Sequence, residues 1–406
     1  MLLSISWRNI WRNKVRSLVI IFSIALGIFA GVIAGAFFKG MADQRVQKVI
    51  NTELSYIQIH NPGFEQTSDF TNFLSNAEEI DEKIRKIPNV TGVSRRMSVE
   101  SMAASAETAS GVLISGVFPE DEKEVTNINS KIIDGQYFDG ITRNPVVIGK
   151  KLAEKLNIKV KSKLIITIQD MENNITSGAF RVAGIYSTDN NIFDESNVFV
   201  RFSDIQKLTN FPKNAAHEIA IKINDNLNLA SVMTAVQDAT GNKLDVKSWK
   251  ELSPEMSYLT EAMDMYMYIF IIIILMALLF GIINTMLMVV MERTKEIGML
   301  MAIGMNKGKV FSMIVFESVL LSLTGGVVGI IIGAVSAKFG ETHPVDLSVW
   351  AQGYQQLGYD AFVYTKLDPE MLINVTILVI ITGVIAAIYP AYKALKNDPA
   401  DALRIE

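Results

Sequence analysis

The stretch MYMYIFIIIILMALLFGIINTMLMVVM, from Met265 to Met291, decides the fold because it contains no charged residue. An apolar helix of about 20 residues crosses the roughly 30 Å hydrocarbon core of a bilayer. Three further runs have similar length and character: Leu18–Phe38, Val310–Ala337 (broken only by Glu317) and Met371–Tyr392. The sequence therefore predicts a membrane α-helical protein with four transmembrane helices.

The long interval between the first and second apolar runs, residues 39–264, has the mixed polar pattern of a water-soluble fold. Strand-like and helix-like pieces alternate in it without βαβ regularity, which indicates an α+β domain. The expected strands are 54–60, 111–118, 146–149, 163–169 and 180–186, and the expected helices are 76–86, 150–156 and 227–240. The length allows two lobes, one from 50–115 and 205–250 and a second inserted at 116–204.

Basic residues beside the apolar runs predict the orientation in the membrane. They stand before the first run, between the second and third, and after the fourth: Arg8, Arg12, Lys14 and Arg16; Arg293, Lys295, Lys307 and Lys309; Lys393, Lys396 and Arg404. Both termini are then cytoplasmic, and the large domain is extracytoplasmic. The first run is longer than the apolar region of about 7–15 residues in a signal peptide, so we expect a retained helix.

These predictions divide the chain into nine segments in order. They are a cytoplasmic interfacial helix with Trp7 and Trp11 (1–17), the first span (18–38), the extracytoplasmic α+β domain (39–264), the second span (265–291), a cytoplasmic loop (292–309), the third span (310–337), an extracytoplasmic loop (338–370), the fourth span (371–392) and a cytoplasmic tail (393–406). The tryptophans and arginines of the first segment are typical of a helix lying at headgroup depth.

Several kinds of chemistry find no support in the sequence. Cysteine is absent, and the three histidines are too far apart in sequence for a metal-ligand motif. The segment Gly304–Val310 fails as a phosphate loop because its glycines are one residue too close and Val310 replaces the Ser or Thr. No basic tract suits nucleic acid. We therefore expect no catalytic residue, no metal and no bound cofactor in this chain.

Glycines recur every four residues in two of the spans: Gly27, Gly31 and Gly35 in the first, and Gly325, Gly329 and Gly333 in the third. Removing Cβ along one helix stripe allows a neighbouring backbone to approach closely. The pattern predicts close helix packing, and the sequence leaves open whether the seam lies within one bundle or between subunits.

Glu317 is the one ionisable residue inside the predicted spans. An intramembrane carboxylate suggests a transport or proton-transfer role by default. It lies about 12 Å along the helix from Lys309, so a structural ion pair near the inner surface is the alternative. Lys309, Arg293 and the N-terminal basic helix are the expected partners.

The loop ERTKEIGMLMAIG, residues 292–304, predicts a short helix between the second and third spans. Ile297, Leu300, Met301 and Gly304 fall on one face, which suits docking into a groove on a soluble partner. A connector lying on the membrane surface is the alternative. The candidate coupling residues are Glu292, Arg293, Lys295, Glu296, Ile297, Gly298, Leu300, Met301 and Gly304.

Methionines gather where the second span begins, at Met256, Met263, Met265 and Met267. Flexible thioethers suit an adaptable apolar surface. Met256, Met263 and Met267 are therefore candidates for a surface that meets the lipid chains of a substrate, with ordinary lipid-facing packing as the alternative.

The order of one span, a large domain and three more spans resembles the MacB/LolC/FtsX family of ABC transporter permeases, called type VII. Four separated segments are similar to motifs of that family. They are Trp7–Ser17 at the N-terminus, Asp134–Phe138 with Val146–Gly149 in the large domain, Arg293–Gly304 as the coupling helix, and Pro390–Ala394 with Asp398–Arg404 in the tail. Met301 departs from the family, which often has Lys or Arg there, so one docking contact is expected to be apolar.

The resemblance implies a permease subunit that transmits ATP-driven motion of a separate ABC ATPase to the external domain. ATP and Mg²⁺ would then be bound by that partner, and a second permease copy, identical or related, would complete the unit in the bacterial cell (inner) membrane. By the same resemblance the lobes correspond to Porter and Sabre subdomains. Release of lipoproteins, efflux of peptides or drugs with periplasmic partners, and signal transmission without transport are the alternative activities.

Overall fold

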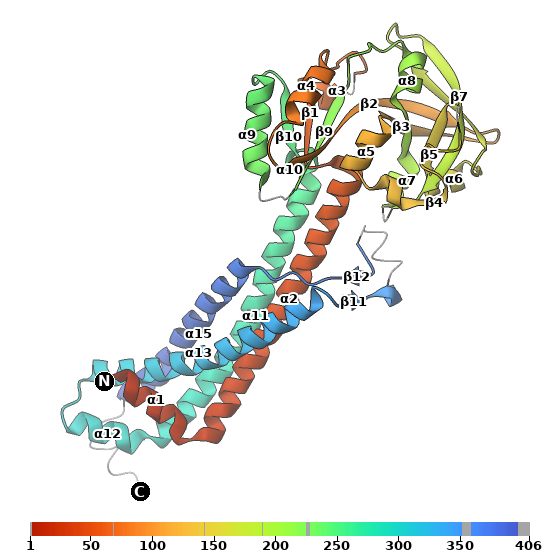
Figure 1. Ribbon diagram of the computed structural model, residues 1–406. Helices are drawn as coiled ribbons and strands as arrows, with labels where there is room; N and C mark the ends of the chain where they lie inside the picture. The colour runs from red at the N-terminus through yellow and green to blue at the C-terminus, as the bar shows by residue number, and fades with distance from the viewer. Residues whose placement is uncertain are drawn as a thin grey trace. The chain divides into compact units, whose positions relative to one another are not determined.

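The computed structural model describes residues 2–67, 69–141, 143–188, 190–224, 228–350 and 359–396 (Figure 1). The chain divides into two compact units. The membrane unit contains Met1–Asp43, Leu259–Leu347 and Phe362–Glu406, and the α+β unit contains Gln44–Tyr258 and Ser348–Ala361. The tail motif expected at Asp398–Arg404 lies outside the described residues.

Four helices are long and apolar enough to cross a membrane, as predicted. They are α2 (Lys14–Val49), which continues as the π-helical turn η1 (Ile50–Leu54), α11 (Pro254–Glu292), α13 (Lys307–Gly340) and α15 (Pro369–Lys396). Each helix extends beyond its apolar run, because helical hydrogen bonding does not stop where lipid-compatible residues stop. The predicted domain limits at 39 and 264 therefore fall inside α2 and α11.

Two short helices complete the membrane unit, α1 (Leu2–Arg12) and α12 (Thr294–Ala302), together with the hairpin β11 (Val345–Asp346) and β12 (Phe362–Val363). Helix α1 packs on α13, where the Ser6 hydroxyl donates to the carbonyl of Met313 at 3.1 Å and Ile10 is buried (Figure 1). Trp7 stays partly exposed, with its ring edge-on to Trp11. The helix predicted at the N-terminus is confirmed, and its place at the lipid interface remains a prediction.

Within the described residues, the α+β unit contains ten strands in one sheet. The strands are β1 (Ile57–His60), β2 (Val90–Ala104), β3 (Ala109–Val117), β4 (Ile132–Gly135), β5 (Pro145–Gly149), β6 (Lys163–Gln169), β7 (Ile175–Tyr186), β8 (Asn197–Arg201), β9 (Glu218–Ile223) and β10 (Asp245–Ser248). The helices are α3 (Phe64–Thr67), α4 (Ala77–Ile84), α5 (Pro119–Val125), η2 (Ile128–Lys131), α6 (Lys150–Lys155), α7 (Asn191–Ser196), α8 (Phe202–Thr209), α9 (Leu229–Thr240), α10 (Trp249–Leu252) and η4 (Ser348–Trp350).

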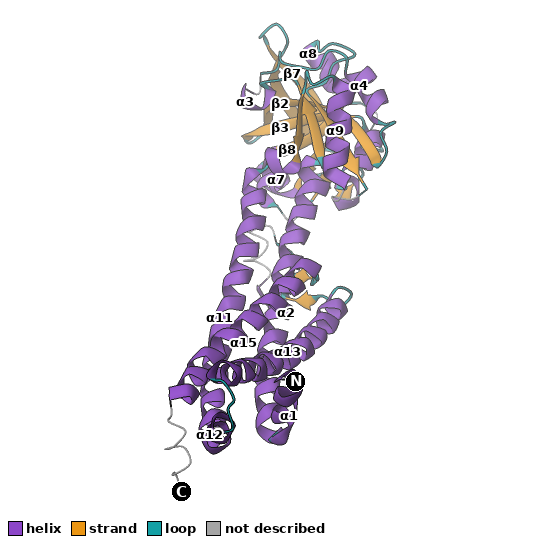
Figure 2. Ribbon diagram, turned by 90° about the vertical axis from the view of Figure 1, so that its left-hand side faces the viewer, coloured by secondary structure: helices purple, strands orange, loops and turns teal. Residues whose placement is uncertain are grey.

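The long strand β2 belongs to two parts of this sheet. Its first half pairs antiparallel with β9, which leads on to β1 and β10. Its second half pairs with β3 on one side and β6 on the other, and the pairings β3–β8, β8–β5, β5–β7 and β7–β6 close a ring. Helices α4 and α9 pack side by side on the open part of the sheet (Figure 2).

Two main hydrophobic cores correspond to these two parts. One core gathers residues 46–93 and 216–249, and the other gathers residues 97–215 inside the ring. The division into two lobes stays a prediction, and the two cores divide the chain at positions other than the expected boundaries. Residues 97–115 and 205–215, which we assigned to the first lobe, contribute Ile114, Ile205 and Phe211 to the second core. The ring needs β2, β3 and α8, and no local sequence signal marks that closure.

Strand β2 was not predicted because polar residues interrupt its apolar alternation. Ser94 and Arg96 are nevertheless buried, and both donate to the buried carboxylate of Glu122, from Arg96 Nη2 at 2.7 Å. Arg96 also bonds Glu218 at 2.7 Å. Burial acts to raise the pKa of Glu122, but the Arg96 guanidinium outweighs it and holds that pKa below its usual value. The buried charges are thus fully paired, which makes a polar strand compatible with a core position.

Candidate coupling site

The loop between the second and third membrane helices folds as the predicted helix α12. Arg293 leaves helical geometry after α11 and starts the short helix, and Gly304 ends it with a φ of +99°, a conformation that favours glycine. The side chain of Asn306 then caps α13 by accepting from the Gly308 amide at 3.0 Å. These two breaks in the backbone make α12 a helix separate from α11 and α13.

One face of α12 packs into the membrane unit. Ile297 and Gly298 are buried, and Met301 and Met305 pack against the same apolar core as α11 and α13. Ile297 is therefore turned into the bundle and Met301 is half-buried, whereas the docking role of the predicted residues stays a prediction. A short helix has to bury its strongest apolar stripe, and here the bundle already supplies the apolar surface that covers it.

The opposite face of α12 is exposed and still contains apolar side chains. Met299 is 51% exposed and Ile303 is 79% exposed, beside the exposed Lys295 and Ala302. Leu300 is half-buried and Gly304 is exposed. Met299 and Ile303 were missed because the prediction placed Ile297, which is buried, on the exposed face. The signal that distinguishes the two faces is the apolar spacing of residues 297, 301 and 305, which continues into the bundle.

Charged residues tie α12 to two other helices of the unit, α1 and α13. Glu296 on α12 accepts from Arg12 of α1 at 2.7 Å and from Arg293 at 3.0 Å. Burial acts to raise the pKa of Glu296, but the bonds from Arg12 and Arg293 hold it below its usual value. Arg293 also reaches both oxygens of Glu317 on α13 at 3.2 Å. The predicted structural ion pair of Glu317 is confirmed, with Arg293 as its partner.

A second ion pair closes the network on the side of the first span. Arg16 of α2 makes two parallel bonds to the carboxylate of Glu292 at the end of α11. Bidentate pairs of a guanidinium with a carboxylate fix the relative orientation of the two side chains as well as their distance. The Ser17 hydroxyl donates to the carbonyl of Ile10, which holds α1 against the start of α2. Helices α1, α2, α11, α12 and α13 are therefore bound at one end of the unit by side-chain contacts.

These charged residues surround a cavity of about 250 Å³ in the membrane unit. Its lining joins polar residues with an apolar base of Ile20, Met286, Val289 and Leu321. The amide nitrogen of Asn9 is buried there without a hydrogen-bond partner. The cavity leaves free space beside Arg12, Arg293 and Glu317, so these side chains have room to exchange partners.

The glycine stripes form close contacts within this chain. A Cβ added at Gly325 or Gly329 would lie 2.8 Å from the carbonyl oxygen of Ile21 or 2.6 Å from that of Ala25, both on α2, and one at Gly333 would lie 2.9 Å from Val32. Gly27 faces Leu278, Gly31 faces Ile274, and Gly35 faces Met371 and Met267. Of the two alternatives left open, packing within one bundle is the one observed. A seam between subunits at the first span stays a prediction.

Only some of the methionines predicted to form a substrate surface are exposed. Met267 is buried against the backbone of Gly35, so it does not face a substrate. Met263 is half-exposed, and Met256 packs against the core of the α+β unit. Met267 was misassigned because helical spacing alone does not say which side of α11 meets the bundle. Among the described residues, no three His, Asp or Glu side chains gather as metal ligands.

Comparison with known proteins identifies the class to which this architecture belongs. The description "MacB-like periplasmic core domain" matches residues 17–239, and "FtsX-like permease C-terminal" matches residues 268–399. The chain belongs to the MacB/LolC/FtsX (type VII) family of ABC transporter permeases.

Individual relatives are distant but cover most of the chain. The lipoprotein-releasing system transmembrane protein LolC of Neisseria meningitidis serogroup B is 23% identical over 76% of this chain and 77% of its own length. The ABC transporter permease YknZ of Bacillus subtilis strain 168 is 26% identical over 90% of this chain and 88% of its own. The crystal structure of the extracellular domain of a YknZ transporter aligns with 48% of this chain and 99% of that domain, at 17% identity and a TM-score of 0.34.

Proposed function

We propose that this permease transmits the ATP-driven motion of a separate ABC ATPase subunit to its α+β domain, and that it thereby extracts or exports lipoproteins or other amphipathic substrates. The observation that supports this most strongly is α12. It presents Met299 and Ile303 on an exposed face while Glu296 and Arg293 bind it to the spans. An apolar face on a short, anchored helix suits a groove on a soluble partner.

The transmission step needs elements that carry displacement along the chain. Helix α2 runs unbroken from Lys14 to Val49, and α11 runs unbroken from Pro254 to Glu292. A movement of α12 would act on α13 through Arg293–Glu317 and on α11 through the turn that joins the two helices, and the pair Arg16–Glu292 would pass a movement of α11 to α2. A ligand-driven change requires contacts that differ between two states, and the space beside Arg12 and Glu317 allows such an exchange. The Porter and Sabre names for the two lobes are part of the same proposal.

The assembly and its setting are inferred from the family. A second copy or a related permease would complete the unit in a bacterial cell membrane, with both termini and α12 on the cytoplasmic side. The basic residues beside the spans support that orientation. Lipoproteins are our first choice of substrate because LolC, by its name, belongs to a lipoprotein-releasing system.

Substitution of the exposed face of α12 tests the docking role. We expect Ile303→Glu to leave the melting temperature unchanged, since this side chain has no core contact, and to lower transport coupled to the partner ATPase at least tenfold. The matched control is Ile192→Glu in α7, which alters a side chain of similar exposure, 78%, in the α+β unit. Normal ATP-driven transport by the Ile303→Glu variant would remove the docking assignment.

Two other activities remain as alternatives within this family. Efflux of peptides or drugs and signal transmission without transport both use the same coupling helix. Purification of the complex from native membranes, with mass spectrometry of bound molecules, separates them. Acylated proteins bound to the complex support lipoprotein extraction, peptides or drugs support efflux, and a bound external hydrolase without any substrate supports signalling.

A further inference from the structure

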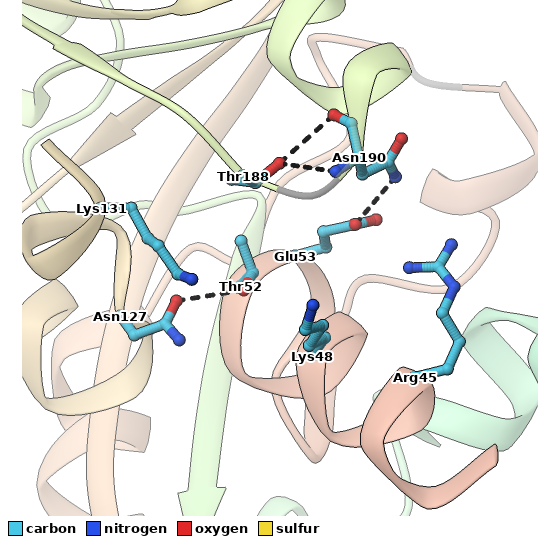
Figure 3. A pocket seen from close by; sticks show the side chains of 8 residues that line it. All are labelled: Arg45, Lys48, Thr52, Glu53, Asn127, Lys131, Thr188 and Asn190. Carbon is cyan, nitrogen blue, oxygen red and sulfur yellow. Dashed lines mark hydrogen bonds between the residues drawn. The ribbon is translucent and has the colours of Figure 1, made fainter. Parts of the chain in front are cut away.

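A small open-sided cavity lies in the α+β unit, where the end of α2 and the turn η1 meet the loops before η2 and α7 (Figure 3). Its volume of about 30 Å³ has room for a couple of water-sized groups. The lining is entirely polar: Arg45, Lys48, Thr52, Glu53, Asn127, Lys131, Thr188 and Asn190. No part of the coupling site contributes to it.

Positive charge exceeds negative charge in this lining, by three basic side chains to one carboxylate. Lys48 is paired with Asp360 at 2.5 Å. The side chains of Arg45 and Lys131 make no hydrogen bond or ion pair within the described ranges, and the Nε of Arg45 is buried without an acceptor. Buried donors in folded proteins nearly always have a partner, so an orphaned guanidinium nitrogen beside a cavity indicates a missing acceptor.

Hydrogen bonds hold the walls of the cavity in place. The Thr52 hydroxyl donates to the side-chain oxygen of Asn127 at 3.0 Å, and the backbone N–H of Asn127 donates to the carbonyl of Asn51 at 2.9 Å. The side-chain amide of Asn190 donates to Glu53 at 2.9 Å, and in Figure 3 the Glu53 carboxylate points toward Asn190. Thr52 and Glu53 lie on a π-helical turn, a geometry that occurs often at functional sites.

We propose that this cavity binds a phosphate group, with Arg45 and Lys131 as its charge partners and Thr52 and Asn127 as positioning residues. A guanidinium, an ammonium and neutral hydroxyl and amide groups are the side chains that recognise phosphate oxygens. The volume admits two of those oxygens and leaves the remainder of the ligand outside. This fits a phosphate ester, or a free phosphate ion held at the opening.

A phospholipid headgroup and inorganic phosphate would supply the same chemistry. Six residues separate Phe38, the end of the first apolar run, from Arg45. Both residues lie on the continuous helix α2, so they are about 10 Å apart along its axis. A lipid phosphate at the end of the apolar run would therefore lie near the site. The proposal does not depend on the function proposed for α12.

Binding to the purified full chain in a phosphate-free detergent tests the site, with phosphorus NMR titration as the readout. The two probes are inorganic phosphate and a short-chain phosphatidylglycerol. We expect Arg45→Gln and Lys131→Gln each to weaken binding at least tenfold. Glu53→Gln should tighten it several-fold, because it removes the single repelling carboxylate. Lys243→Gln is the matched control, since it removes an exposed lysine outside the cavity.

Each outcome of this titration supports or overturns the proposed phosphate site. Binding of the lipid alone supports a headgroup site, and equal binding of inorganic phosphate supports a site for the free ion. Binding of neither probe, or binding that Lys243→Gln weakens as much as Lys131→Gln does, overturns the proposal. If Arg45→Gln fails to fold, Lys131→Gln still tests the site, because Lys131 makes no side-chain bond in the described parts of the chain that its loss would break.

Discussion

The type of partner that Glu317 needs follows from the sequence, whereas the particular partner follows from the structure. An acidic group inside a span must find a cation, and the nearest candidates were basic residues of the flanking loops. The structure selects Arg293, which lies between Glu317 and Glu296 and bonds both. Sequence spacing could not select it over Lys309, because the choice depends on how α11 turns into α12.

Removal of Arg293 should leave a buried carboxylate without its cation. We expect Arg293→Ala to destabilise the protein by about 3–5 kcal/mol, the usual cost of breaking one side of a buried pair. The measurement is thermal unfolding in detergent. The double variant Arg293→Met with Glu317→Leu should recover much of that loss, since no charge is left buried. Equal melting temperatures for the single and double variants would contradict the pairing.

The histidine His217 should make the α+β unit sensitive to mild acid. Burial lowers its pKa from 6.5 to about 4, and its ring donates to the Phe70 carbonyl at 2.9 Å. The unfolded chain therefore takes up the proton first as the pH falls. The contribution of His217 to stability is complete above pH 6.5 and declines down to about pH 4, by roughly 3 kcal/mol in all.

Hydrogen-exchange mass spectrometry of β1 and β9 in the full chain measures this effect. Protection should fall between pH 6.5 and 4 after correction for the intrinsic exchange rate. The variant His217→Gln cannot be protonated in this range, so its protection should change less. A wild-type protein and a variant with identical pH profiles would show that His217 is not held neutral.

At the scale of elements, the seam between α2 and α13 is the contact that glycine makes possible. Gly325, Gly329 and Gly333 line one stripe of α13, and the α2 backbone lies against them. The sequence predicted a close seam from the spacing alone. It did not identify the partner helix, because a glycine stripe fits any backbone that can approach it.

A large side chain in that seam should separate the two helices. We expect Gly329→Leu to lower the free energy of unfolding by about 1–3 kcal/mol, since its Cβ would meet the carbonyl oxygen of Ala25 at 2.6 Å. The matched control is Gly281→Leu in α11, where an added Cβ meets nothing within 4 Å. Thermal unfolding of both variants in the same detergent provides the comparison. Similar losses for the two variants would show that the α2–α13 contact does not matter for stability.

In the molecule as a whole, the elements that could be predicted are those that depend on local sequence. Four apolar helices and strands such as β6 follow from runs and alternation within a few residues. The ring of strands and the course of β2 could not be predicted, because Arg96 is acceptable in a core only when Glu122 and Glu218 arrive from elsewhere in the chain. The burial of Ile297 on α12 could not be predicted for the same reason: both faces of this helix contain apolar residues, and tertiary packing decides which one is buried.

The most direct test of transmission is the distance between two spin labels in the complete complex with its ATPase. The chain has no cysteine, so Lys243→Cys in the α+β unit and Lys338→Cys at the end of α13 give one labelled pair. We predict that ATP shifts the distance distribution measured by pulsed electron resonance, and that Ile303→Glu abolishes the shift. An ATP-dependent shift that persists with Ile303→Glu, or a distribution that ATP leaves unchanged in the wild type, would contradict the account.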